Sequence, residues 1–149
     1  MSVSNVTPTA AECELCDVSR GDVVVSNAQW RVILVDDANY PGFCRVIWTA
    51  HVKEMTDLNE TDRNVLMQVV WKTESAIRAI MQPHKMNLAS FGNMVPHLHW
   101  HLIPRYTDDA HFPNPVWAAA NVEVPEQTIV EARRSLLPQL RNELIARLS

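Results

Sequence analysis

The stretch VPHLHWHLIPRY, residues 95–106, alternates three histidines with large apolar residues. Side chains of a β-strand point to opposite faces in turn, so His97, His99 and His101 would share one face, at roughly 7 Å spacing. The intervening leucines and tryptophan would share the other face and pack against the core. The stretch therefore predicts a strand over 97–103, ended by Pro104, with one face in the core and one face free for chemistry.

Segments on both sides of this strand predict further strands and a long helix. The additional strands, rich in β-branched or apolar residues, are expected at 22–27, 30–35, 43–48 and 85–91. From Asn59, apolar residues recur at helical spacing, with Asp62 three residues after this candidate N-cap. Pro83 is expected to end the helix after about 20 residues. Short connections between consecutive strands favour antiparallel pairing, so the chain is predicted to be α+β.

The C-terminal part predicts an additional helix over residues 129–148, with Pro138 inside the pattern. A proline in that position indicates a kink or two helical pieces. The length of 149 residues fits a single domain, 1–149, with a polar and flexible start at 1–10.

Composition limits the possible partners and location. The formal net charge is −4 without charged blocks, which argues against binding to nucleic-acid polymers or membranes. No apolar run is long enough for a transmembrane helix, and the N-terminus lacks the features of a signal peptide, so a cytoplasmic protein is expected. With only three glycines, the chain has no glycine-rich phosphate loop.

The alternating histidines have three interpretations. They could be solvated residues on an open sheet face, although three in strict alternation are improbable there. They could bind a metal, because His-x-His on a strand is a common ligand pair. They could instead act on phosphorus, because a neutral imidazole is a nucleophile and neighbouring imidazoles can stabilise charge on phosphoryl oxygens.

The sequence HLHWHLIPR at 97–105 resembles the motif of the histidine triad (HIT) family, His-φ-His-φ-His-φ-φ with φ apolar, including the Ile-Pro-Arg that commonly follows. Upstream, YPGFCRVIWTAHVKEMTDL at 40–58 resembles the family's strand, its terminal histidine and the entry to the long helix. The resemblance covers about 13–106 as the family core and leaves 107–149 as a C-terminal extension. It implies an antiparallel sheet of about five strands with helices, a homodimer, and a small-molecule nucleotide as ligand.

The resemblance also implies a role for each histidine. His99 would be the nucleophile that takes the nucleotidyl group, and His101 would contact the phosphate. His97 and His51 would flank and orient the site.

Other residues of the nucleotide site follow from the same resemblance. Asp36 or Asp37 would meet the ribose hydroxyls, and the count leaves both open. The loop GNMVPH at 92–97 departs from the family's Gly-Gln-Ser-Val: Asn93 can replace the glutamine as an amide, whereas Met94 cannot replace the hydroxyl. Arg105 would either anchor a phosphate or form a structural salt bridge.

Cys13 and Cys16 form a C-x-x-C pair with three interpretations. They could be two small apolar residues, a redox pair, or half of a zinc site. A closed zinc site needs two more ligands, for which His51 and His97 are the best candidates, as in some bacterial histidine triad proteins that this arrangement resembles. Cys44, on a predicted strand, is expected in the core.

Two functions remain open at this point. The first is a hydrolase or transferase acting at the α-phosphate of a nucleotide through a covalent nucleotidyl-histidine intermediate. It would be a nucleotide phosphoramidase or a dinucleoside polyphosphate hydrolase. The second is a non-catalytic nucleotide-binding or zinc-stabilised interaction protein, suggested by Met94. Trp117, in the extension, either caps a nucleotide base or packs against the sheet.

Overall fold

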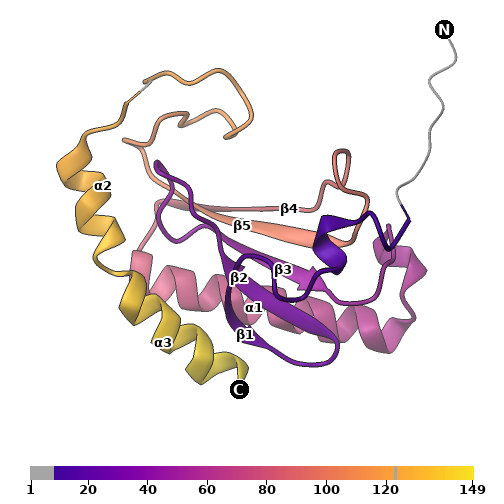
Figure 1. Cartoon of the computed structure of the whole chain (residues 1–149). Helices are drawn as coiled ribbons and strands as arrows, with labels where there is room; N and C mark the ends of the chain where they lie inside the picture. The colour runs from indigo at the N-terminus through magenta and orange to yellow at the C-terminus, as the bar shows by residue number, and fades with distance from the viewer. Residues whose placement is uncertain (1–8, 123) are drawn as a thin grey trace, which may run out of the picture.

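One antiparallel sheet organises the computed structural model, which describes residues 9–122 and 124–149 (Figure 1). Its five strands lie in the order β1-β2-β3-β5-β4. The strands are β1 (Asp22–Ser26), β2 (Trp30–Leu34), β3 (Cys44–Trp48), β4 (Lys85–Ala89) and β5 (His99–Arg105). The predicted α+β architecture, with about five antiparallel strands, a long helix and an additional C-terminal helix, is confirmed.

Helices cover one face of this sheet, as Figure 1 shows. The long helix α1 (Glu60–Met81) lies along β3 and β5, and α3 (Leu137–Leu148) packs against α1 and β1. The short helix α2 (Gln127–Arg134) precedes α3. Two 3-10 turns complete the structure, η1 (Glu14–Cys16) and η2 (Met55–Asp57), and η1 lies on the side of the sheet away from α1 (Figure 1).

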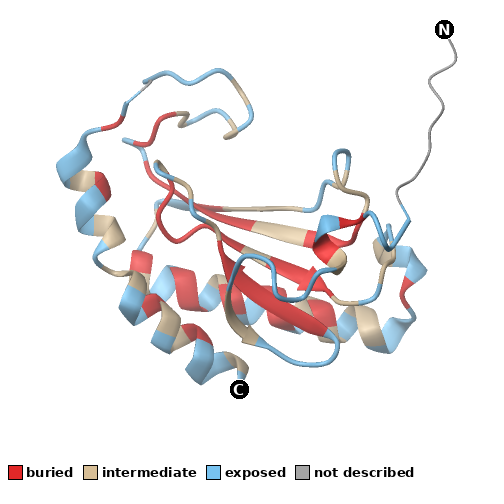
Figure 2. Ribbon diagram, in the orientation of Figure 1, coloured by how far each residue is buried: buried red, intermediate tan, exposed pale blue. Residues whose placement is uncertain are grey.

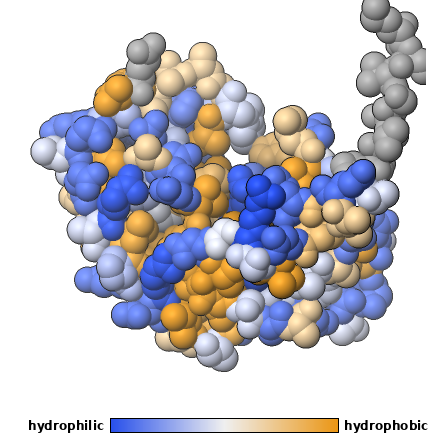
Figure 3. All heavy atoms as spheres, in the orientation of Figure 1, coloured by the Kyte–Doolittle hydropathy of each residue, from blue (hydrophilic) through white to orange (hydrophobic). Residues whose placement is uncertain are grey.

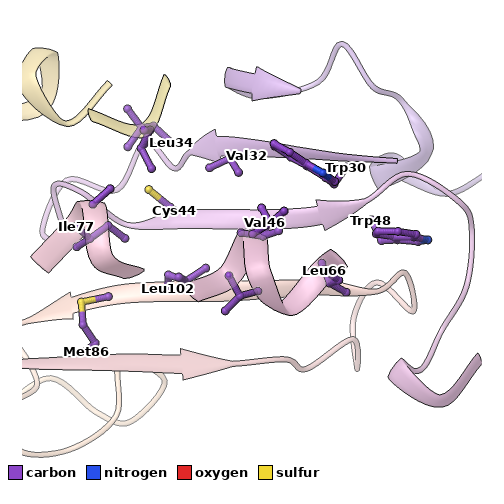
Figure 4. Close-up of a cluster of buried hydrophobic side chains, with 14 of the residues drawn as sticks. Trp30, Val32, Leu34, Cys44, Val46, Trp48, Leu66, Ile77, Met86 and Leu102 are labelled. Carbon is purple, nitrogen blue, oxygen red and sulfur yellow. The ribbon is translucent and has the colours of Figure 1, made fainter. Parts of the chain in front are cut away.

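The core lies between the sheet and α1. Val32, Val46 and Leu102 point from three adjacent strands toward Leu66 and Ile77 of the helix, and all five are fully buried (Figure 4). The helical surfaces that face the sheet are buried, and the outer surfaces are exposed (Figure 2). Burial of this apolar area is the main stabilising term of the fold.

Side-chain alternation on β3 sorts its residues between two faces. Cys44 and Val46 are fully buried in the core, so the prediction for Cys44 is confirmed. Arg45 and Ile47 therefore point to the opposite face, on which η1 lies. Ile47 packs there in a small cluster with Leu15 of η1.

The helix boundaries agree with the sequence predictions. The Asn59 side chain accepts a hydrogen bond from the backbone N–H of Asp62, 2.8 Å, and α1 ends at Met81 before a left-handed Gln82. The C-terminal helical region is two pieces, and Pro138 lies in the first turn of α3, where a missing N–H costs nothing.

No described helix combines the length and apolarity needed to cross a lipid bilayer.

Two predictions about the histidine strand are wrong. β5 begins at His99, so His97 precedes the strand, and its backbone N–H bonds to the Val95 carbonyl in a tight turn, 2.8 Å. Pro104 does not end the strand but pairs with Met86 inside it. The pairing of β5 with β3 stops at Leu102, so no β3 partner requires an N–H at Pro104.

Candidate functional site

Strand β5 presents His99 and His101 on the face opposite the core. They lie across from Ile47 and Arg45 of β3, respectively, and their Nε2 atoms are 3.0 Å apart. The Nδ1–H of His99 donates to the carbonyl oxygen of His97, 2.6 Å. This bond assigns the proton of neutral His99 to Nδ1 and leaves a lone pair on Nε2, to which the Nε2–H of His101 can donate.

Burial keeps these two histidines in the neutral form. It lowers the pKa of His99, and the nearby charge of Arg45 lowers it further, against the opposing hydrogen bond to the His97 carbonyl. Burial, followed by interaction with His99 and Arg45, lowers the pKa of His101 to about 4. At neutral pH, both rings are therefore uncharged, which is the form that can attack phosphorus.

A cavity of about 510 Å³ opens above the histidine pair, within the range of small-molecule sites. Its walls include His99, His101, Arg45, Asn93, Met94, Phe91 and Trp117. In Figure 3 the molecular surface is hollowed between the loop that precedes β5 and the segment that follows it, with apolar residues in the hollow.

Aromatic and apolar side chains form the outer wall of this cavity. Phe91 contacts His101 edge-to-face with ring centroids 5.5 Å apart, and Trp117 contacts Phe91 in the same way at 4.9 Å. Met94 is 92% exposed at the cavity, and Asn93 beside it is also exposed. Trp117, 63% exposed, is thus placed at the cavity rather than in the core.

A second, smaller cavity of about 280 Å³ adjoins the first. The two share Glu14, Leu15 and Arg45 as a common wall. Asp36 is exposed and lines the second cavity, whereas the Asp37 carboxylate accepts the backbone N–H of Asn39, 2.9 Å, in its own turn. Of the two candidate ribose contacts, only Asp36 lines this cavity.

Cys13, Cys16, His51 and His97 converge from three parts of the chain, with ligand atoms within 4.8 Å of one another. Cys13 Sγ is 3.4 Å and Cys16 Sγ is 3.5 Å from His97 Nδ1. His51 Nδ1 lies 3.3 Å from both Cys16 Sγ and His97 Nδ1. Tetrahedral zinc, with bonds of ~2.0 Å to nitrogen and ~2.3 Å to sulfur, separates its ligand atoms by roughly 3.3–3.8 Å. The donor set and these spacings fit zinc.

Neighbouring groups hold this cluster in a form suited to a metal. The His97 Nε2–H donates to the Trp48 carbonyl oxygen, 2.6 Å, which leaves the Nδ1 lone pair directed at the cysteines. Burial lowers the pKa of His97, which also favours the neutral ligand form. Arg31, 2% exposed, donates from Nη2 to the Leu15 carbonyl, 2.9 Å, and so fixes the turn between the two cysteines.

The structure places Arg105 away from both cavities. Its guanidinium forms a buried ion pair with Asp109, 2.7 Å, and donates to the Asn87 side chain, 2.8 Å, and the Asn114 carbonyl, 2.7 Å. These contacts support the structural salt bridge, one of the two interpretations open from the sequence, and leave no role at the histidines.

Sequence reasoning missed Arg45 and Arg31. Arg45 is the only cation in the apolar strand segment FCRVIW, and its alternation with Cys44 puts it on the histidine side. The side of the sheet on which Arg45 lies could therefore be predicted once Cys44 had been assigned to the core. Arg31 sits in a strand whose five residues are all buried, so alternation carried no signal there.

Comparisons with known proteins agree with this geometry. The family model described as HIT domain matches residues 17–108, more than half of the chain. The solved structure of a histidine triad protein from Bradyrhizobium japonicum is 31% identical with a TM-score of 0.65, covering 83% of this chain and 91% of that one. A histidine triad protein from Marinobacter aquaeolei VT8 is 29% identical with a TM-score of 0.61, covering 80% and 91%, respectively.

Curated relatives match over a smaller share of each chain. A Mycobacterium tuberculosis protein named AP-4-A phosphorylase, present in two strains, is 28% identical over 102 residues. The match covers 64% of this chain and 51% of the relative, so the chain spans about half the length of the curated relatives it matches.

Proposed function

Because the chain belongs to the histidine triad (HIT) domain family, we propose that it is a nucleotide hydrolase or transferase acting at the α-phosphate through a nucleotidyl-histidine intermediate. The observation that carries the proposal is His99, whose Nδ1–H is bonded to the His97 carbonyl, so that Nε2 carries a lone pair next to the cavity. The relative named AP-4-A phosphorylase supports a dinucleoside polyphosphate as one substrate class.

The reaction would proceed in two balanced steps. Nε2 of His99 attacks the α-phosphorus, a phosphorus–nitrogen bond forms, and the bond to the leaving group breaks with its electron pair. The resulting imidazolium is stabilised by the His97 carbonyl, and the Nε2–H of His101 can donate to a phosphoryl oxygen. Water then attacks phosphorus, the phosphorus–nitrogen bond breaks, and the proton of water passes to solvent.

The cavities suggest how a nucleotide would lie. Asp36 would bond the ribose hydroxyls in the smaller cavity, and the leaving group would occupy the larger one beside Asn93 and Met94. Since Met94 supplies no proton, leaving groups that depart as anions, such as nucleotide polyphosphates, are favoured over amines of phosphoramidates.

Zinc is proposed as a structural ion held by Cys13, Cys16, His51 and His97. When bound, it would brace the N-terminal turn against β5, and the chemical steps themselves would fall to His99 and His101. Metal analysis of purified protein tests this assignment: about one zinc per chain that is lost in Cys13→Ser supports it, and wild-type protein without zinc contradicts it.

The remaining features of the proposal concern the whole chain. We propose a single HIT-like domain over 1–149, with family core 13–106 and extension 107–149, in a cytoplasmic homodimer. Strand β4 is an edge of the sheet, and Trp71 on α1 is 51% exposed, a position consistent with a subunit interface. Light scattering that gives the mass of one chain would contradict the dimer.

Turnover of a diadenosine polyphosphate and of an adenosine phosphoramidate tests the catalytic proposal. Wild type and a His84→Ala control, at an exposed site that lines neither cavity, should turn over equally, and His99→Ala should lose activity by several orders of magnitude. Equal rates for wild type and His99→Ala refute the proposal. Tight nucleotide binding without turnover supports the alternative, a non-catalytic nucleotide-binding protein.

A further inference from the structure

We propose that Arg45 binds the phosphoryl group undergoing transfer and supplies the positive charge at the junction of the two cavities. This inference rests on the proposed function, because it names a phosphate ligand for that same site. Neither the sequence motif nor the two interpretations of Arg105 pointed to this residue.

Position is the first argument. Arg45 lies directly across from His101 in the β3–β5 pairing, on the same face of the sheet, where opposite side chains are roughly 5 Å apart at Cβ. It lines both cavities, whereas the two histidines line only the larger one. If the nucleoside of a substrate lies in one cavity and its leaving group in the other, the phosphate between them lies beside Arg45.

Arg45 also has donors without acceptors. Its Nε is buried and has no hydrogen-bond partner, and no ion pair to Arg45 occurs within residues 9–122 and 124–149. The nearest acidic residue on the shared wall, Glu14, pairs with Arg20 at 3.5 Å. Burying an unsatisfied donor is costly. A phosphate oxygen in the cavity that Arg45 lines would give its guanidinium a charge-assisted partner.

Arg45 contrasts with the other arginine once considered for this role. The Arg105 guanidinium has acceptors for each of its nitrogens, in Asp109, Asn87 and the Asn114 carbonyl. The Arg45 guanidinium instead lies 5.6 Å from the ring centroid of Phe43, a contact that does not use its in-plane donors. The guanidinium donors of Arg105 are thus all used within the fold, whereas the guanidinium of Arg45 can bind a ligand.

The charge of Arg45 also suits a transferring phosphoryl group. Phosphoryl transfer places negative charge on the equatorial oxygens, which cationic groups stabilise most strongly in a partly buried site. His101 offers a hydrogen bond but no formal charge at neutral pH, since its pKa is lowered to about 4. Arg45 is the sole cation among the described residues that line the larger cavity.

Ligand binding tests this role without requiring turnover. Calorimetry would compare AMP with adenosine for wild type and Arg45→Gln. The variant should bind AMP ~10- to 100-fold more weakly and adenosine equally, because a hydrogen bond to a charged group contributes about 1.5–3 kcal/mol. Arg78→Gln, which removes an exposed arginine of α1 that lines neither cavity, serves as the matched control and should change AMP affinity less than about threefold.

Two further variants keep the test decisive. Arg45→Met retains the apolar stem and replaces Arg45→Gln if thermal unfolding shows that the latter is not folded. Arg45→Lys keeps the charge but not the planar fork, so it should recover part of the AMP affinity. Unchanged preference for AMP over adenosine in a folded Arg45→Gln or Arg45→Met protein overturns the inference.

The outcomes separate this inference from the proposed reaction. If AMP affinity falls in the Arg45 variants while wild type hydrolyses nothing, Arg45 binds phosphate and the hydrolase proposal fails. If wild type hydrolyses a dinucleoside polyphosphate and the Arg45 variants retain both kcat and AMP affinity, the reaction stands and the role of Arg45 is refuted.

Discussion

Replacing Asp109 by asparagine should destabilise the protein strongly, because this carboxylate is the centre of a buried network. Its two oxygens accept from Nε and Nη2 of Arg105 and from the backbone N–H groups of Tyr106, His111 and Phe112. Side chains of the Arg105–Asp109 pair are each 2% exposed. Asparagine offers one acceptor oxygen and turns the other position into a donor that faces donors.

The expected loss at neutral pH is ~3–5 kcal/mol of unfolding free energy, the usual cost of leaving one partner of a buried ion pair unpaired. Part of this loss depends on pH. Burial alone would raise the pKa of Asp109, but hydrogen bonds from Arg105 and the backbone outweigh it and lower the pKa to about 2 from 3.8. That shift corresponds to about 2 kcal/mol of stability, which is present above pH 3.8 and lost as pH falls toward 2.

Urea unfolding at pH 5 and pH 3 measures both parts. The difference in unfolding free energy between wild type and Asp109→Asn should shrink by about 1 kcal/mol at pH 3, because the variant has no proton to bind at this position. Asp108→Asn is the matched control: its carboxylate is 44% exposed and pairs with Arg133, so it should cost under about 1 kcal/mol.

The assay also distinguishes the two interpretations of Arg105. If Arg105 serves the fold, the Asp109 network should hold the segment that carries Trp117, and its fluorescence should change in Asp109→Asn. A loss below 1 kcal/mol, or a difference that stays constant from pH 5 to pH 3, would refute the reasoning from the buried pair.

Three other substitutions follow from single features of the structure. His101→Asn removes a group whose pKa falls from 6.5 to about 4 on folding. Wild type should therefore lose stability relative to the variant as the pH drops from 6.5 to 4. Parallel acid unfolding curves for the two proteins would contradict this. Gly42→Ala should lower the free energy of unfolding by roughly 1–2 kcal/mol, because φ is +90° and the new Cβ would lie 3.0 Å from Met81 Cγ; an unchanged urea midpoint speaks against it. Met94→Ser, at a 92% exposed position, should leave stability unchanged. It should raise kcat/KM for a phosphoramidate several-fold relative to kcat/KM for a dinucleoside polyphosphate, because the serine hydroxyl can donate a proton to the leaving group. An unchanged ratio of these two kcat/KM values argues against that reasoning.

Local pattern was sufficient to predict the fold and the histidine pair. Alternation of period two identifies β5, and the cap at Asn59 is a local contact of its side chain with a backbone N–H three residues later. The start of β5 was placed too early because the chain makes a tight turn at His97. Pro104 was misjudged because the extent of pairing with β3, which no local pattern reports, decides whether its missing N–H matters.

Roles that depend on tertiary contacts were harder to predict. Arg105 and Asp109 are four residues apart outside any helix, so only the folded segment shows that they form a buried pair. The members of the Cys13 cluster could be predicted from the sequence because a closed zinc site needs two ligands besides the cysteine pair, and His51 and His97 were the best candidates. That no described residue forms an ion pair with Arg45 could be seen only from the contacts of the acidic residues in the folded structure.

The spacing of two residues between His97 and His99 joins the candidate metal cluster to the proposed nucleophile. The side chain of His97 belongs to the cluster with Cys13 and Cys16, while its carbonyl accepts the Nδ1–H of His99. The Trp48 carbonyl fixes the His97 ring from the other side. Since that single backbone carbonyl determines which nitrogen of His99 carries the lone pair, whatever holds the His97 backbone in place also orients Nε2, the proposed attacking atom. His97 would therefore act on the reaction through His99, as a positioning residue that does not touch the substrate.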